Sequence, residues 1–309
     1  MTRAPGALVG GQAVIEGVMV RAPQGWAVAV RRPDGTIEAV SHPLPRLSTR
    51  VRLARMPFVR GVLVLAEAMT LGLRALSWSA QKAVGEEEEP ITGRQLAFTM
   101  AAALAVFLAL FILLPALAAE ALPIRSSLAF NLVEGLLRIG LFLGYIWAIG
   151  RSGEIRRVFQ YHGAEHKTIH AYENGDPLGV ERVQRHPTLH PRCGTNFLLI
   201  VLLLSIFVFA LLGKPGVVGL VVSRVVLVPV IAAVAYEVIK LAARREERGW
   251  LRALMAPGLA LQRLTTAPPD DQMVEVAITS LLAALDAAEV EEVKARGPVC
   301  PVALAALSA

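Results

Sequence analysis

The stretch that decides the fold runs from Leu96 to Ala119 and reads LAFTMAAALAVFLALFILLPALAA, 24 residues without a charged side chain. A helix rises about 1.5 Å per residue, so this length extends roughly 36 Å and can cross a hydrocarbon core of about 30 Å. The stretch therefore predicts a transmembrane helix.

Three further stretches have the same character: Ser127–Gly150, Phe197–Gly213 and Val217–Leu241. The first of them carries Glu134 and Arg138, which stand four residues apart on one helical face and can pair. Pro115 and Pro229 predict kinks. Short connections join the stretches in pairs, the second pair through Gly213-Lys214-Pro215-Gly216. The sequence predicts a mainly α-helical integral membrane protein with about four transmembrane helices in two hairpins.

Composition and charge agree with this fold class. Of 309 residues, 55% are hydrophobic, 18% are charged and 6% are aromatic, which is too apolar for a wholly soluble protein. The 31 Lys and Arg exceed the 25 Asp and Glu. Residues 1–95 hold 12 of these basic side chains, and residues 151–195 and 242–309 hold seven each. The positive-inside rule then places these segments and both termini in the cytoplasm, and the charge is not read as a nucleic-acid footprint.

We therefore expect a multi-pass protein of the inner (plasma) membrane whose first expected partner is the lipid bilayer. The expected segments are an N-terminal cytoplasmic β region (1–50), an amphipathic interfacial helix with an acidic linker (51–95), the first transmembrane hairpin (96–150), a cytoplasmic His-rich helix and loop (151–195), the second transmembrane hairpin (196–241) and a C-terminal cytoplasmic helical region (242–309). The acidic linker is Glu86–Glu89 followed by Pro90.

A small sheet is expected near the N-terminus. Alternating apolar residues in 26–31 and 36–40 flank Arg32-Pro33-Asp34-Gly35, which is typical of a β-hairpin. In the preceding strand region, alternation places Gln12, Val14 and Glu16 on one face. Residues 58–80 are apolar but contain Glu67 and Arg74, which favours an interfacial helix over a fifth span.

The histidines indicate where chemistry is expected. Five of the six lie between residues 162 and 190. A helix places His162, Glu165, His166, His170 and Glu173 on one face. The run His162-x-x-Glu165-His166 has the H-x-x-E-H form of inverted zinc peptidases, in which two histidines bind the metal and the glutamate handles a proton. We expect a divalent metal, zinc in the first place, on His162 and His166, with Glu165 as general base.

A catalytic zinc site needs a third protein ligand. Glu237 is preferred because an ionisable side chain at the end of an apolar run is costly. His190 and Cys193, with Arg192 between them, are the rival ligands. Further candidates are Gln12 and Glu16, which could point toward the same site, and a polar segment expected to be a loop, whose members are Gln262, Arg263, Thr265 and Thr266. That loop precedes a helix that Asp270 or Asp271 can cap.

Five motifs together resemble the YqhQ family of bacterial multi-pass membrane proteins. They are GGQAVIEGVMVR (10–21), the stretch 58–80, YHGAEHKTI (161–169), HPRCGTNF (190–197) and LQRLTTAPPDDQMVEVAI (261–278). The family is catalogued as a domain of unknown function and as a predicted metal-dependent enzyme. The resemblance therefore implies an enzyme without naming its reaction.

The favoured hypothesis is metal-assisted hydrolysis of a peptide, lipid headgroup or phosphoester at the cytoplasmic membrane surface. One alternative is a non-enzymatic scaffold or assembly factor that binds another membrane protein or a second copy of itself. Another is a transporter that uses Glu134, Arg138 and Arg224 as buried charges on a pathway, which would require an oligomer.

Overall fold

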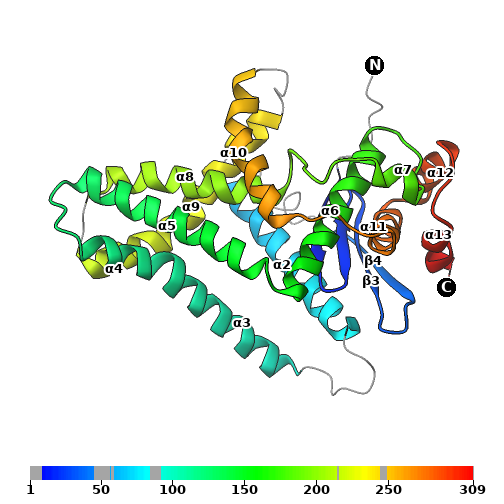
Figure 1. Cartoon of the computed structure of the whole chain (residues 1–309), viewed down its shortest axis with the longest axis horizontal. Helices are drawn as coiled ribbons and strands as arrows, with labels where there is room; N and C mark the ends of the chain where they lie inside the picture. The colour runs from blue at the N-terminus through cyan, green and yellow to red at the C-terminus, as the bar shows by residue number, and fades with distance from the viewer. Residues whose placement is uncertain are drawn as a thin grey trace.

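The structure is a computed structural model, and it describes residues 9–44, 56, 59–83, 92–213, 216–243 and 249–308. A bundle of long apolar helices lies beside a small sheet covered by shorter helices (Figure 1). The expected acidic linker and the turn residues Lys214 and Pro215 lie outside the described residues.

Among the described residues, four helices are long and apolar enough to cross a membrane: Gly93–Glu120, Ser127–Ile149, Gly194–Leu211 and Val218–Val238. The first comprises α3 (Gly93–Leu108), the π-helical segment η2 (Ala109–Leu113) and α4 (Leu114–Glu120). The others are α5 (Ser127–Ile149), α8 (Gly194–Leu211) and α9 (Val217–Ala243). All four predicted helices are present, within a few residues of their expected ends.

The irregular segment η2 precedes Pro115, where a kink was expected. A proline has no N–H, so the carbonyl four residues earlier loses its helical partner. That carbonyl belongs to Phe111, and it accepts a hydrogen bond from Arg138 Nε of α5 at 3.0 Å. This hydrogen bond joins η2 to α5.

The predicted pair of Glu134 and Arg138 forms, and Arg224 of α9 joins it. Arg224 Nη2 lies 2.6 Å from Glu134 Oε2 and donates to Asn131 Oδ1 at 2.8 Å. The three charged side chains are 1–6% exposed. The Glu134 carboxylate therefore forms ion pairs with two guanidinium groups, and the pair with Arg224 links α5 to α9 inside the bundle.

The sheet is an antiparallel meander in the order β1-β2-β3-β4, formed by β1 (Gly10–Val14), β2 (Gly17–Arg21), β3 (Gly25–Arg31) and β4 (Ile37–Pro43). The predicted hairpin is confirmed as β3 and β4. The expectation that Glu16 shares a strand face with Gln12 and Val14 is wrong. Glu16 lies in the turn between β1 and β2 with φ of 50°, because residues 10–21 form two short strands instead of one.

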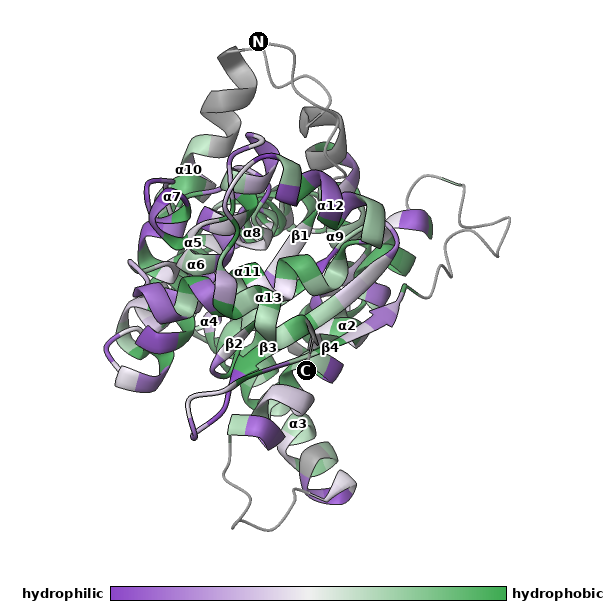
Figure 2. Ribbon diagram, turned by 90° about the vertical axis from the view of Figure 1, so that its right-hand side faces the viewer, coloured by the Kyte–Doolittle hydropathy of each residue, from purple (hydrophilic) through white to green (hydrophobic). Residues whose placement is uncertain are grey.

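The two faces of the sheet pack against different helices. One face packs on α2 (Val59–Ala83), the helix expected over 58–80, through Met19, Val28 and Leu71. The other packs on α6 (Gly153–Glu173) and α11 (Asp271–Ala284), through side chains such as Val18, Tyr161 and Ile278. Seen from the sheet side, apolar residues follow the strands and α11, whereas α7 (Val180–Gln184) is hydrophilic (Figure 2).

The remaining helices are α10 (Gly249–Thr265), α12 (Ala287–Ala295) and α13 (Pro301–Ser308). The predicted loop at Gln262–Thr265 is wrong, because α10 continues through Pro257 to Thr265. Close packing of α10 on α8 outweighs the cost of the proline: a Cβ on Gly258 would lie 2.2 Å from Asn196 Oδ1. Asp270 caps α11 as expected, accepting from the backbone N–H of Met273 at 2.8 Å.

Candidate metal centre

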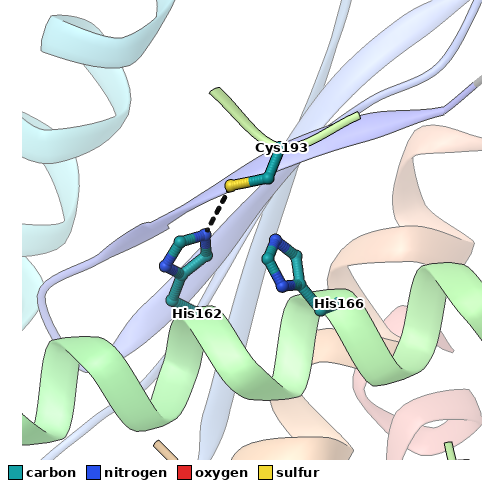
Figure 3. A group of neighbouring side chains, drawn as sticks. All are labelled: His162, His166 and Cys193. Atoms are coloured by element: carbon teal, nitrogen blue, oxygen red, sulfur yellow. Dashed lines mark hydrogen bonds between the residues drawn. The ribbon is translucent and has the colours of Figure 1, made fainter. Parts of the chain in front are cut away.

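The site is built on α6, which presents the two histidines of the H-x-x-E-H run side by side (Figure 3). The rings of His162 and His166 have centroids 4.4 Å apart, as expected for side chains one helical turn apart. α6 packs on β1 and α11, and of the two rings His166 is buried and His162 is half-buried.

Cys193 supplies the third donor from a different part of the chain. It is the N-cap of α8, where its Sγ accepts a hydrogen bond from the Thr195 N–H at 3.5 Å. His162 Nε2 lies 3.2 Å from this sulfur. One donor atom from each of His162, His166 and Cys193 lies within 4.8 Å of the other two. Among the described residues, these three form the one group of three or more His, Cys, Asp or Glu side chains that could hold a metal ion.

The outer ring nitrogens fix the tautomers of both histidines. His162 Nδ1 contacts the Thr265 carbonyl at 2.8 Å, and His166 Nδ1 contacts the Thr188 carbonyl at 2.5 Å. A carbonyl only accepts, so each Nδ1 carries a proton, and Nε2 is the ring atom left to bind a cation. Histidine ligands of metal ions are commonly oriented by such a second contact. These contacts orient both imidazole rings within the group that also contains the Cys193 sulfur.

Glu165 is buried between the two histidines and β1. Its Oε2 lies 3.4 Å from His166 Nε2, and the backbone N–H of Gly11 hydrogen-bonds to its carboxylate. A Cβ on Gly11 would come within 2.8 Å of Glu165 Oε1, so only glycine leaves room here. Burial raises the pKa of Glu165 to about 8, against a smaller lowering by His162. The carboxyl is therefore largely protonated at neutral pH when no cation is bound.

Burial also shifts the pKa of two of the donors, His166 and Cys193. It lowers the pKa of His166 to about 2, with further lowering by His162, so the imidazole is neutral. It raises the pKa of the Cys193 thiol, which the contacts with Thr195 partly offset. Two imidazoles and one thiol are the nitrogen and sulfur donors that suit a borderline-soft cation such as zinc. In tetrahedral zinc sites, N and S ligands lie about 3.5 Å apart, close to the His162–Cys193 separation.

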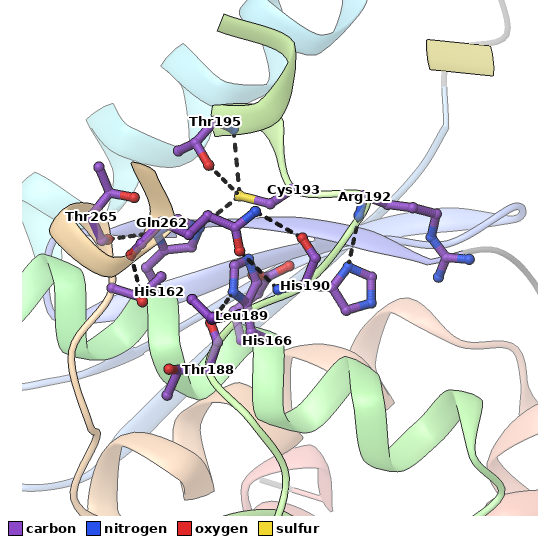
Figure 4. A network of polar contacts seen from close by, with 12 residues as sticks. His162, His166, Thr188, Leu189, His190, Arg192, Cys193, Thr195, Gln262 and Thr265 are labelled. Atoms are coloured by element: carbon purple, nitrogen blue, oxygen red, sulfur yellow. Dashed lines mark hydrogen bonds and ion pairs between the residues drawn. The ribbon is translucent and has the colours of Figure 1, made fainter. Parts of the chain in front are cut away.

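Gln262, expected in a loop, holds the segment that precedes α8 (Figure 4). Its Oε1 accepts from the His190 N–H at 2.8 Å, and its Nε2 donates to the His190 carbonyl at 2.8 Å and to Asn196 Oδ1 at 3.0 Å. Thr266 donates both its N–H and its hydroxyl to the Gln262 carbonyl. The polar segment therefore positions the cysteine loop and, through the Thr265 carbonyl, the first histidine.

The candidates His170, Glu173, His190 and Arg192 form a second group beside the donor atoms. His190 Nδ1 accepts from the Arg192 N–H at 3.3 Å, and its Nε2 lies 3.5 Å from Glu173. Arg192 and Glu173 form an ion pair. The ring centroids of His190 and His170 are 4.5 Å apart. His190 uses both ring nitrogens elsewhere, so it borders the donor group without joining it.

The other predicted residues lie apart from the donor atoms. Glu237, the preferred third ligand, forms a two-pronged contact with Arg60 at 2.7 and 2.8 Å, so the structure brings Cys193 and not Glu237 to the histidines. Glu16 pairs with Arg157. Gln12 donates to the Gly72 carbonyl at 3.2 Å, and Arg263 is exposed. Sequence reasoning missed the contacts of Thr188 and Gly11, because backbone groups leave no signal in a side-chain pattern.

Comparisons with known proteins agree with the resemblance seen in the motifs. The family described as "Protein of unknown function (DUF1385)" matches residues 56–287. The uncharacterized protein YqhQ of Bacillus subtilis (strain 168) is 36% identical over 286 residues, which covers 88% of this chain and 90% of that protein. No solved structure matches the chain.

Proposed function

The chain belongs to the DUF1385 family of proteins of unknown function, and from its own residues we propose that it is a zinc-dependent hydrolase of the plasma membrane. Its site would face the cytoplasm and act on a peptide, lipid headgroup or phosphoester. The observation that carries the proposal is the convergence of two histidine Nε2 atoms and one cysteine sulfur, with each Nδ1 held by a carbonyl.

Each residue has a distinct role in this proposal. His162, His166 and Cys193 would hold the cation, and three protein ligands leave a fourth position for substrate or water, as in catalytic zinc sites. The chemistry that a bound divalent cation supplies is Lewis acidity, which makes water nucleophilic at neutral pH. Glu165 lies beside the three proposed ligands, and the positive charge of a cation bound there would favour its carboxylate form. The ionised Glu165 can then accept a proton from the attacking water.

The position of the site in the chain supports action at a membrane surface. Cys193 directly precedes α8, one of the four helices long enough to cross a bilayer. If these helices span the membrane as proposed, Cys193 lies at the level of the headgroups. The many basic residues in the segments around the site favour the cytoplasmic side for it and for both termini.

Metal content of the purified full-length protein tests the proposal. Elemental analysis after purification without chelators or added metal is expected to give about one zinc per chain. H162A, H166A and C193S each remove a ligand and are expected to lower this to near zero. The matched control is H186A, because His186 belongs to the same His-rich segment but pairs with Asp176 outside the donor group.

Parent protein without bound metal would overturn the proposal and would favour the scaffold hypothesis instead. Equal loss of zinc in H186A and in the three ligand variants would also contradict it, because the loss would then not report on the donor group.

A further inference from the structure

Two hollows adjoin each other on the side of the sheet that faces away from the metal centre. One, of about 690 Å³, lies between the sheet and α2 and is lined by Trp26 and His42. The other, of about 650 Å³, lies between α2 and α3 and is lined by Leu73, Ala97 and Met100. Arg74 and Trp78 line both hollows. We call the two together the α2–α3 groove.

The walls of the groove suit an acyl chain. Most of the lining side chains are aliphatic or aromatic. Trp26 and Trp78 are amphipathic side chains of the kind that gathers where a membrane meets water. Ala97 and Met100 lie in the first turns of α3, the start of the first candidate span. The groove therefore runs from the interfacial level of the protein into the level of the hydrocarbon.

The apolar surface of α3 is left largely exposed by the described residues. Its main contacts are with η2, which continues it. Phe98 is 77% exposed, Leu104 58% and Val106 64%. An apolar helix with so few protein contacts is stable only in a lipid environment or against a partner.

The charge at the centre of the groove favours a phosphate group. Two other basic side chains of this region are paired, Lys82 with Glu38 and Arg21 with Glu67. Arg74 is exposed, and no carboxylate of the described residues lies within ion-pair distance of it. A guanidinium group has a planar array of donors that matches a phosphate. Arg74 is the one charged side chain among the described residues that line the groove, and most of the others are apolar. This arrangement is complementary to a molecule with one anionic group and long apolar chains.

We propose that the α2–α3 groove is a binding site for a bilayer phospholipid. Arg74 contacts the phosphate, Trp78 packs on the glycerol region, and an acyl chain lies along Leu73, Ala97 and Met100. The site is distinct from the metal centre, since the sheet separates α2 from α6. It rests on the membrane placement of α3 proposed above and not on the metal chemistry.

Native mass spectrometry of the full-length protein tests the site. The protein, washed free of lipid in detergent, is titrated with phosphatidylglycerol, and bound lipid per chain is counted. A97W fills the groove and is expected to abolish the tightest binding event. A103W places the same bulk on an exposed position of α3 outside the groove and is expected to bind as the parent does.

The charge is tested in the same way. R74A is expected to weaken binding by about tenfold or more, equal to about 1.4 kcal/mol. R156A, an exposed arginine of α6, is expected to leave it unchanged. If A97W fails to fold, the comparison of lipid binding by R74A and R156A is by itself the test of the proposed site.

Three results would overturn the proposal. They are equal lipid binding by A97W and A103W, equal binding by R74A and R156A, and a stoichiometric polypeptide that A97W displaces in place of lipid. None of them depends on zinc content, so failure here is distinguishable from failure of the proposed hydrolase.

Discussion

Replacing Gln262 by alanine should loosen the segment that carries Cys193. The buried amide makes three hydrogen bonds, two with the backbone of His190 and one with Asn196. A typical bond contributes about 1 kcal/mol net, so Q262A should cost about 3 kcal/mol. For a chain of this size class, each kcal/mol lost from the free energy of unfolding lowers the melting temperature by roughly 2–4 °C, so Q262A should lower it by about 6–12 °C.

Thermal unfolding and hydrogen exchange of the purified protein measure this effect. Exchange should rise most in residues 188–196, because the lost bonds hold that segment and not the helices of the bundle. R263A is the matched control: Arg263 is the next residue on α10 and is exposed, so its change should stay within about 0.5 kcal/mol. Equal melting temperatures and equal exchange in Q262A and R263A would refute the role assigned to Gln262.

Three further perturbations test other parts of the structure. E134L leaves Arg138 and Arg224 buried without their carboxylate and should destabilise the protein by about 3–5 kcal/mol in thermal melts. The triple variant E134L/R138M/R224M should recover most of that loss, and no recovery would contradict the pairing. G11A should lower the melting temperature because its Cβ would lie 2.7 Å from the Met19 carbonyl and 2.8 Å from Glu165 Oε1, whereas G10A, with nothing within 4 Å, should be neutral; equal effects would argue against the contact. For the metal-free protein, Glu165 keeps its proton to about pH 8 when folded but loses it near 4.5 when unfolded, so this group makes stability fall as pH rises between these values. His166 opposes that trend only below its ordinary pKa of 6.5. Melting curves from pH 6.5 to 8 should therefore decline in the parent and flatten in E165Q, and parallel curves would contradict the assignment.

The parts of the fold that depend on local pattern could be predicted from the sequence. The four apolar helices and the hairpin around Arg32–Gly35 were found because length, periodicity and turn residues are local signals. The division of residues 10–21 into two strands was missed. The turn at Glu16 has a positive φ without the glycine that usually marks such a position.

Only the part of the candidate site that lies on a single helix, α6, could be predicted from the sequence. His162, Glu165 and His166 follow from helical spacing, and the structure brings them together. The choice between Glu237 and Cys193 depends on how α6, α8 and α9 pack, which spacing along the chain does not encode. Likewise, Pro257 signals a break, but the packing of α10 on α8 keeps the helix continuous as far as Thr265.

The coordination of bound zinc tests the account most directly. X-ray absorption at the zinc edge of the purified full-length protein should show nitrogen or oxygen ligands at about 2.0 Å and one sulfur at about 2.3 Å. The sulfur should disappear in C193S and persist in C300S, since Cys300 is buried in the core around α11. Absence of bound zinc, or a sulfur shell unchanged by C193S, would contradict a metal centre formed by His162, His166 and Cys193.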